Sequence, residues 1–214
     1  MCYSVKEIFY TIQGEGLNSG RPAVFLRFSG CNLWSGREQD RAAGKGGCSQ
    51  WCDTDFVGTD GTLGGRYLNA EALASVVQGL WPAPGEGRAL VVCTGGEPLL
   101  QLDTPLLEAL HAAGFEIAIE SNGTLPIPIG VDWVCISPKA GSTMVVDSGD
   151  ELKLVFPQKG CEPSGFEQLG FRHFLLQPLD GPNLAEHTQG VLAYCLAHPR
   201  WRVSIQAHKH LGIR

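Results

Sequence analysis

Residues 28–56 read FSGCNLWSGREQDRAAGKGGCSQWCDTDF and contain three of the eight cysteines of the chain, Cys31, Cys48 and Cys52. The stretch follows a short apolar segment and is rich in glycine and polar residues, which predicts one long loop. Three thiolates on a loop fall one short of the four that close a structural zinc site. They also suit an iron–sulfur cluster that leaves one iron open to another ligand. The spacing of the cysteines alone does not decide between these two kinds of metal site.

Size and composition limit the possible classes of protein. The 214 residues, 43% of them apolar, are enough for one sizeable core, so we expect a single domain over residues 1–214. The formal net charge of −6 argues against passive binding to nucleic acid, which needs a basic face. No apolar run approaches the roughly 20 residues of a membrane-spanning helix. The first residues, MCYSVKEIFY, show no signal-peptide pattern, so we expect a cytoplasmic location.

Short apolar segments rich in branched or aromatic residues recur along the chain. They lie at 24–28, 90–93, 115–119, 133–136, 152–156, 174–176 and 203–205. Such segments have the pattern of strands that are buried on both faces, as in a parallel sheet. We therefore predict seven sheet strands.

Helical patterns fall between several of these strands. They begin at Asn69, Thr104 and Asn183. Asn183 and Glu186 have the spacing of a capping box. No helix fits the connections 121–131 and 140–150, and a closed eight-fold barrel typically takes about 250 residues. We therefore predict an α/β fold in the form of an incomplete, open barrel of mostly parallel strands with some crossover helices missing.

A polar or glycine-containing cluster follows each predicted strand. The clusters are SGC (29–31), TGGEP (94–98), ESNG (120–123), SPK (137–139), PQK (157–159), QPLD (177–180) and QAHK (206–209). The carboxyl ends of parallel strands meet at one edge of a sheet, where α/β proteins bind their ligands. Clusters at every strand end predict one large binding site built by the whole sheet.

The order of these motifs resembles the radical S-adenosylmethionine (SAM) superfamily and, within it, the 7-carboxy-7-deazaguanine synthase family. The resemblance runs from IQGEG at 12–16, through the cysteine loop with CDTDF, GGEP, SPK and QPLD, to QAHKHLGIR at 206–214. GGEP alone is a moderately specific signal, whereas the ordered set is a strong one. One departure concerns Cys48 and Cys52, which are separated by three residues where the superfamily commonly has two.

The resemblance implies the conversion of 6-carboxy-5,6,7,8-tetrahydropterin to 7-carboxy-7-deazaguanine with release of ammonia, in queuosine and deazapurine biosynthesis. It implies that the three loop cysteines hold a [4Fe–4S] cluster whose open iron binds SAM, and that SAM is cleaved to a 5′-deoxyadenosyl radical. It also implies Mg²⁺, a reducing electron donor of flavodoxin or ferredoxin type, and a homodimer. The cluster loop is expected over about residues 29–56, and a tail that closes over the substrate over about residues 207–214.

The resemblance divides the site into parts. SAM would be bound by Gly95, Gly96, Ser137, Pro138, Lys139, Gln177, Pro178, Leu179 and Asp180. The pterin would be bound by Ile12, Gln13, Gly14, Arg27, Thr94 and, through its terminal carboxylate, Arg214. Thr54 of CDTDF would contribute an oxygen ligand to Mg²⁺. No residue is assigned to catalysis, and Glu120 is a candidate for handling protons.

Arg27 stands out without the resemblance, because it lies in an apolar strand next to the cysteine loop. A guanidinium there can hold a carboxylate bidentately. The plainer interpretation of Arg27 is an ion pair with a surface acid. For the whole chain two other functions stay open: a radical SAM enzyme that activates a glycyl-radical partner protein, and a zinc-binding module without enzymatic activity.

Overall fold

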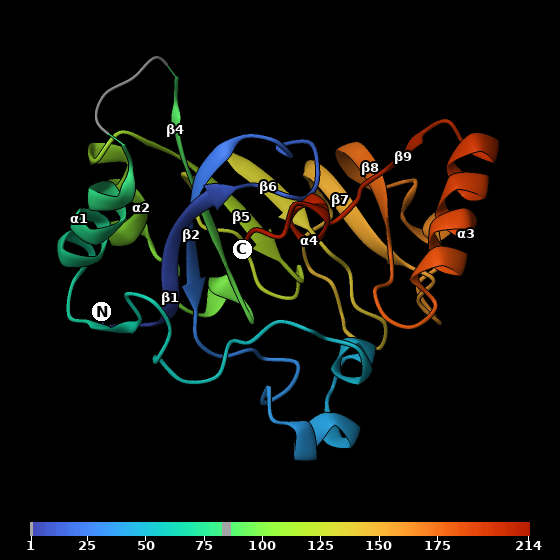
Figure 1. Ribbon diagram of the computed structural model, residues 1–214, viewed down its shortest axis with the longest axis horizontal. Helices are drawn as coiled ribbons and strands as arrows, with labels where there is room; N and C mark the ends of the chain where they lie inside the picture. Colours follow the sequence, from blue (N-terminus) through green and yellow to red (C-terminus); the bar gives the residue numbers. More distant parts are fainter. Residues whose placement is uncertain (1, 83–86) are drawn as a thin grey trace.

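One sheet of nine strands runs through the described part of the chain (Figure 1), in the order β3-β1-β2-β4-β5-β6-β7-β8-β9. The computed structural model describes residues 2–82 and 87–214. The strands are β1 (Tyr3–Ile12), β2 (Pro22–Phe28), β3 (Gly65–Tyr67), β4 (Ala89–Gly95), β5 (Phe115–Ser121), β6 (Trp133–Ile136), β7 (Ser148–Phe156), β8 (Gly170–Pro178) and β9 (Trp201–Val203).

Along the sheet, β2, β4, β5, β6, β7, β8 and β9 pair in parallel, each with the next. Among the described strands, the antiparallel pairs are those of β1 with β2 and with β3. The sheet is open, because β3 and β9 form its two edges. The prediction of an open, mostly parallel α/β fold is therefore confirmed. The last strand was predicted two residues too late, since Ser204 and Ile205 follow β9.

The sequence prediction missed β1 because charged residues interrupt its apolar pattern. Lys6 and Glu7 lie in the middle of the strand, and the pairing register with β2 shifts between Val5 and Glu7. Such a bulge breaks the alternation by which a half-buried strand is recognised. Lys6 is nevertheless buried, and its ammonium group lies 2.7 Å from Asp60 and 2.8 Å from Asp55. The missed β3 spans only three residues.

The longer helices are α1 (Ala70–Leu80), α2 (Thr104–Ala112) and α3 (Leu184–Ala197), and α4 (Ala207–Leu211) is short. Asn69 caps α1 as predicted, by accepting a hydrogen bond from the Ala72 amide at 2.8 Å. The capping box predicted at Asn183 is wrong. Asn183 makes no side-chain cap bond and its backbone, at ψ 18°, lacks the extended conformation of a cap residue. No described helix is long and apolar enough to cross a membrane.

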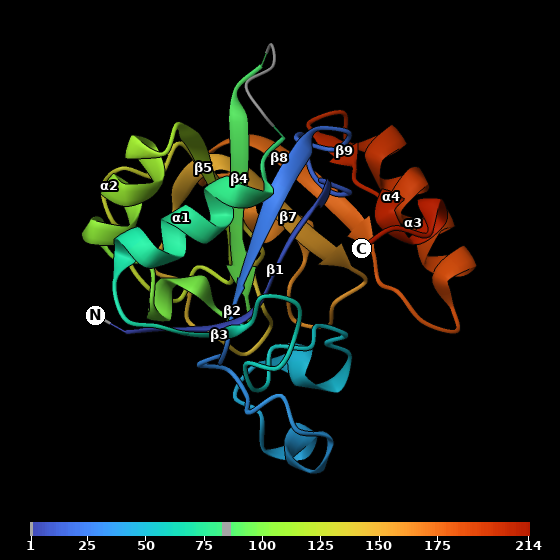
Figure 2. The same cartoon turned by 60° about the vertical axis from the view of Figure 1, so that its left-hand side comes forward.

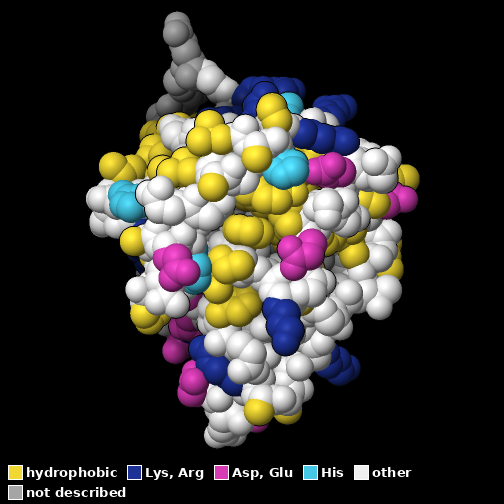
Figure 3. All heavy atoms as spheres, turned by 90° about the vertical axis from the view of Figure 1, so that its right-hand side faces the viewer, with side chains coloured by type: hydrophobic (Ala, Val, Ile, Leu, Met, Phe, Trp, Pro, Cys, Tyr) yellow, Lys and Arg dark blue, Asp and Glu magenta, His cyan; other side chains and the backbone are white. Residues whose placement is uncertain are grey.

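Helices α1 and α2 cover one part of the sheet, as far as β5, and α3 covers the other part at β7 to β9 (Figures 1 and 2). Helices α1 and α2 pack with the first strands around one buried cluster, and α3 packs on the last strands around a second. The connections 122–132 and 137–147 contain no helix, as predicted. On the side of α3 and β9, exposed hydrophobic side chains gather on the surface (Figure 3), among them Leu192, Leu196 and Val203.

The structure predicts a large cost for truncating the core at Leu110. This side chain of α2 is fully buried in the first cluster. Leu110→Ala should lower the free energy of unfolding by about 2–5 kcal/mol, since it removes apolar contacts and leaves a cavity. Urea unfolding followed by circular dichroism measures the change. The control is Leu196→Ala, because Leu196 is 83% exposed on α3. Equal losses in the two variants would contradict the assigned core.

Candidate active site

A cavity of about 390 Å³ lies at the carboxyl ends of the parallel strands. Six of the seven polar clusters that follow the predicted strands contribute to its walls. The predicted site residues that line it are Ile12, Gln13, Gly14, Arg27, Cys31, Cys48, Cys52, Thr54, Thr94, Gly95, Gly96, Glu120, Ser137, Lys139, Gln177, Pro178, Leu179, Asp180 and Arg214. The structure therefore brings nearly the whole predicted set to one place.

Two predicted contributions do not reach this cavity. The cluster at 157–159 is absent from its walls, and so is Pro138. Gln158 instead lies buried behind the SPK turn, where its side chain donates to the Pro138 carbonyl at 3.2 Å and accepts from the Ala140 amide at 2.9 Å. These residues shape the turn that carries Ser137 and Lys139.

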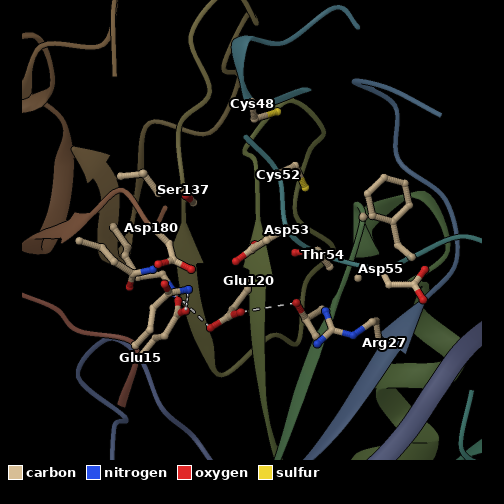
Figure 4. A pocket seen from close by; sticks show the side chains of 18 of the residues that line it. Glu15, Arg27, Cys48, Cys52, Asp53, Thr54, Asp55, Glu120, Ser137 and Asp180 are labelled. Atoms are coloured by element: carbon tan, nitrogen blue, oxygen red, sulfur yellow. Dashed lines mark hydrogen bonds and ion pairs between the residues drawn. The ribbon is translucent and has the colours of Figure 1, made fainter. Parts of the chain in front are cut away.

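The three loop cysteines are free thiols that line the same cavity, and Figure 4 shows Cys48 and Cys52 there. The two that are close in sequence belong to one helical turn: η2 (Gly47–Gln50) starts it, and the Cys52 amide donates to the Cys48 carbonyl at 2.7 Å. That bond between residues four apart accommodates the additional residue in the C-x3-C spacing. Burial raises the pKa of the Cys48 thiol to about 11 and also raises the pKa of Cys31.

The donor set fits an iron–sulfur cluster better than a single metal ion. Within residues 2–82 and 87–214, no three His, Cys, Asp or Glu side chains are placed to hold one ion. The thiols around a cluster of several irons need not approach one another so closely. Three thiols from one loop that line a common cavity match the number of protein ligands that a cluster with one open iron needs.

Two glycines bring the end of β4 against the cysteine loop. A Cβ on Gly95, whose φ is +143°, would lie 2.4 Å from the Phe28 carbonyl oxygen. A Cβ on Gly96 would lie 2.2 Å from the Gly30 carbonyl oxygen and 2.7 Å from the Cys31 Cβ. The close contacts of these glycines are with residues 28–31 of the chain itself, so their need for glycine does not depend on a bound ligand.

Glu97 of the GGEP motif was not among the predicted site residues, yet it organises the strand ends. Its carboxylate is fully buried and accepts hydrogen bonds from the Ser121 hydroxyl at 2.9 Å and from the amides of Asn122 and Leu99 at 2.8 and 3.0 Å. Its own amide donates to the Gly30 carbonyl at 3.0 Å. Burial raises the pKa of Glu97. A glutamate directly after two glycines at a strand end was the signal available in the sequence.

A buried ion-pair network forms one wall of the cavity (Figure 4). The Lys153 ammonium contacts the Glu15 carboxylate and lies 3.3 Å from the Glu120 carboxylate. Glu120 also accepts a hydrogen bond from the side-chain amide of Gln13 at 3.1 Å. Burial would lower the pKa of Lys153, but the two carboxylates raise it well above its ordinary value. Burial would raise the pKa of Glu15, and Lys153 outweighs this and lowers it. A lysine inside the apolar strand ELKLVF was the sequence signal for this missed residue.

Arg27 and Arg214 share a carboxylate beside the cavity. The Arg27 Nε donates to Glu7 Oε1 at 2.9 Å, and the Arg214 guanidinium pairs with the other oxygen of Glu7. Arg214 also stacks over the Phe9 ring, 4.7 Å from its centroid. Arg27 is thus ion-paired, but its partner is a largely buried carboxylate of the cavity wall and not a surface acid, and Arg27 lines the cavity as well.

The carboxyl-terminal segment lies against the loop that follows β1. The Ala207 amide donates to the Gly14 carbonyl at 2.9 Å, and a Cβ on Gly14 would lie 2.8 Å from the backbone nitrogen of His208. Lys209 lies 2.7 Å from Asp53 of the cysteine loop and also pairs with Asp180 after β8. Helix α4 therefore joins three loops around the cavity.

Thr54 lies between two acids whose charges are already paired (Figure 4). Asp53 pairs with Lys209, and Asp55 pairs with Lys6 at 2.8 Å. Lys6 lowers the pKa of Asp55 through a hydrogen bond and its charge. Thr54 lines the cavity and offers it a neutral oxygen.

No protein-family model matches the chain. The 7-carboxy-7-deazaguanine synthases of Caulobacter vibrioides and Bradyrhizobium diazoefficiens are 60% and 58% identical to it, and each alignment covers all of both chains. The crystal structure of QueE from Escherichia coli superposes with a TM-score of 0.72 at 28% identity, covering 97% of this chain and 95% of that one. The chain belongs to the 7-carboxy-7-deazaguanine synthase family.

Proposed function

We propose that the chain is a radical SAM enzyme that converts 6-carboxy-5,6,7,8-tetrahydropterin to 7-carboxy-7-deazaguanine with release of ammonia. The observation that carries this proposal is one cavity lined by three free loop thiols and by a set of paired charges around Arg27. Family membership supports the same reaction. The cavity then has two halves, one for the cofactors and one for the carboxylated substrate.

In the cofactor half, Cys31, Cys48 and Cys52 would hold a [4Fe–4S] cluster. When bound, the cluster supplies the electron that cleaves SAM reductively. Ser137, Lys139 and the strand end 177–180 line the cavity and would hold and orient SAM. Gly95 and Gly96 would set the distance between that strand end and the cysteine loop, and Pro138 would act by shaping the SPK turn.

In the substrate half, the Arg27 guanidinium would bind the substrate carboxylate. Glu7 orients Arg27 and leaves its terminal nitrogens available, because the bond to Glu7 uses Nε. Gln13, Glu120 and Thr94 would contact the polar edge of the pterin, with Ile12 and Gly14 forming the adjoining wall. Lys153 would orient Glu120, whose carboxylate oxygens would accept hydrogen bonds from ring N–H groups. Arg214 and the tail 207–214 would close the cavity.

The finer parts of the proposal come from the family resemblance. They are Mg²⁺ bound by Thr54, an electron donor of flavodoxin or ferredoxin type, a homodimer, and a cytoplasmic location. A neutral hydroxyl suits Mg²⁺, which keeps waters and substrate oxygens in its shell.

The function is tested by anaerobic turnover with the carboxy-tetrahydropterin, SAM and dithionite, with the product identified by mass. Formation of 7-carboxy-7-deazaguanine supports the proposal. Reductive cleavage of SAM without conversion of the pterin would instead favour an enzyme that activates a glycyl-radical partner. A purified protein that binds zinc and no iron would favour the zinc-binding module.

Each of the three cysteines should be needed for the cluster. Replacing Cys31, Cys48 or Cys52 by alanine removes one thiolate ligand, so anaerobic reconstitution should no longer produce a full complement of iron and sulfide. Iron analysis and visible absorption measure this. Cys2→Ala is the control, since Cys2 is an exposed cysteine outside the loop. A variant of the trio that keeps a complete [4Fe–4S] cluster would remove that residue from the ligand set.

Arg27→Gln should weaken binding of the carboxy-tetrahydropterin and leave SAM binding unchanged. A hydrogen bond between charged groups contributes roughly 1.5–3 kcal/mol, or about a 10- to 100-fold change in Kd. Calorimetric titration with each ligand separates the two effects. The control is Arg21→Gln, because Arg21 precedes the same strand at its other end and pairs with Glu116 at 2.9 Å. Substrate affinity equal to that of the parent would contradict the role of Arg27.

Thr54→Ala should lose the stimulation of turnover by Mg²⁺, because the variant has no oxygen to offer the ion. Thr54→Ser keeps the hydroxyl and should keep the stimulation. Turnover measured over a range of Mg²⁺ concentrations tests both variants, and SAM affinity should be similar in all three proteins. If the alanine variant responds to Mg²⁺ as the parent does, Thr54 is not the ligand.

A further inference from the structure

Arg41 connects the long interval between Cys31 and Cys48 to the turn that carries Cys48 and Cys52. The residue lies in η1 (Glu38–Ala43). Its guanidinium donates to the Ser49 carbonyl at 2.7 Å and, through both terminal nitrogens, to the Cys52 carbonyl at 3.4 and 3.3 Å. One side chain thus contacts the backbone at both ends of the C-x3-C turn.

The same turn also contacts the backbone of Arg41. The Arg41 carbonyl accepts a hydrogen bond from the Ser49 hydroxyl at 2.8 Å and another from the Gln50 side-chain amide at 3.0 Å. Ser49 is buried. Arg41 therefore binds the turn in both directions, as donor and as acceptor, and its contacts span residues 49–52.

An aromatic contact sets the orientation of the Arg41 guanidinium. The group lies over the Trp34 ring, 4.9 Å from its centroid, and Trp34 is a buried side chain that meets Phe56 edge to face at 5.9 Å. Its ion pair with Glu38 is different in kind, because the Glu38 side chain is 83% exposed and such pairs contribute little. The contacts that position Arg41 are those with Trp34 and with the turn.

We propose that Arg41 is a positioning residue for the cluster: it holds Cys48 and Cys52 in place for ligation and raises the reduction potential of the cluster. This rests on the proposed function, since it requires that these thiolates bind a [4Fe–4S] cluster. Three thiolates give the oxidised cluster a net negative charge, and reduction adds to it. A fixed guanidinium beside the Cys52 carbonyl favours the reduced form, and partners of metal ligands tune both affinity and potential.

Two substitutions separate the geometric effect from the effect of charge. Arg41→Gln removes the positive charge and the pair of terminal nitrogens that donate to the Ser49 and Cys52 carbonyls. It should lose iron to a chelator about tenfold faster than the parent, because loss of a partner of a metal ligand typically lowers metal affinity by about 10- to 100-fold, and its midpoint potential should be more negative. Arg41→Lys keeps the charge but has one nitrogen in place of the two terminal nitrogens of the guanidinium. It should release iron faster than the parent, and its midpoint potential should be close to that of the parent. The control is Arg37→Gln, an exposed arginine of the same loop, which should match the parent in both measurements.

The measurements are made on the reconstituted protein under anaerobic conditions, with iron release followed by absorbance and the potential by a redox titration. Thermal unfolding of the apo-proteins checks that each variant is folded. If Arg41→Gln is unfolded, Arg41→Lys carries the test, and iron release at the parent rate would overturn the positioning role. A potential in Arg41→Gln equal to that of Arg37→Gln would overturn the effect of charge. A parent that binds no cluster would overturn the proposed function instead.

Discussion

The buried carboxylate of Glu97 is the interaction on which the site depends. It connects the end of β5 to the start of η3 (Pro98–Leu100), and the backbone of the same residue holds the loop that follows β2. A buried charge without partners would cost several kcal/mol, and Glu97 avoids this by accepting three hydrogen bonds. The carboxylate can be satisfied only when these strand ends lie in their observed positions. Glu97 therefore ties the position of the cysteine loop to the sheet.

The cavity walls follow the same rule of paired charges. Lys153 lies between Glu15 and Glu120, and Glu7 lies between Arg27 and Arg214. Removing Lys153 would leave two carboxylates of the cavity wall unpaired, which is more costly than the net contribution of the ion pairs. The polar groups of the site are thus held in place before any ligand binds. A preformed arrangement of this kind reduces the ordering that a ligand has to impose.

The sequence predicted those parts of the fold that depend on local pattern. Buried parallel strands such as β6 have a continuous apolar run, and Asn69 has the local chemistry of a helix cap, so both could be recognised. The roles of Lys153 and Glu7 could not be assigned from the sequence. Lys153 pairs with Glu15, which lies more than a hundred residues away in the chain. Glu7 lies in β1, a strand whose apolar pattern is interrupted by a bulge. The positions of site residues at strand ends were predictable, whereas their ion-pair partners were not.

The long interval in the cysteine loop is the part for which the sequence has the least local signal. Closing a longer loop is inexpensive, since each doubling of length costs only about 0.6 kcal/mol, so added length by itself does not explain how the ligands stay in place. Contacts within the loop hold the interval in place. Gly44 packs so closely on Ser49 that a Cβ on Gly44 would lie 2.3 Å from the serine Cβ. The Lys45 backbone amide donates to the Leu33 carbonyl at 2.7 Å. These contacts fold the interval back onto the turn of Cys48. The added residues therefore act as a local support for the thiols, and the Gly47 amide joins this support to the loop that follows β6 by donating to the Ala140 carbonyl at 2.7 Å.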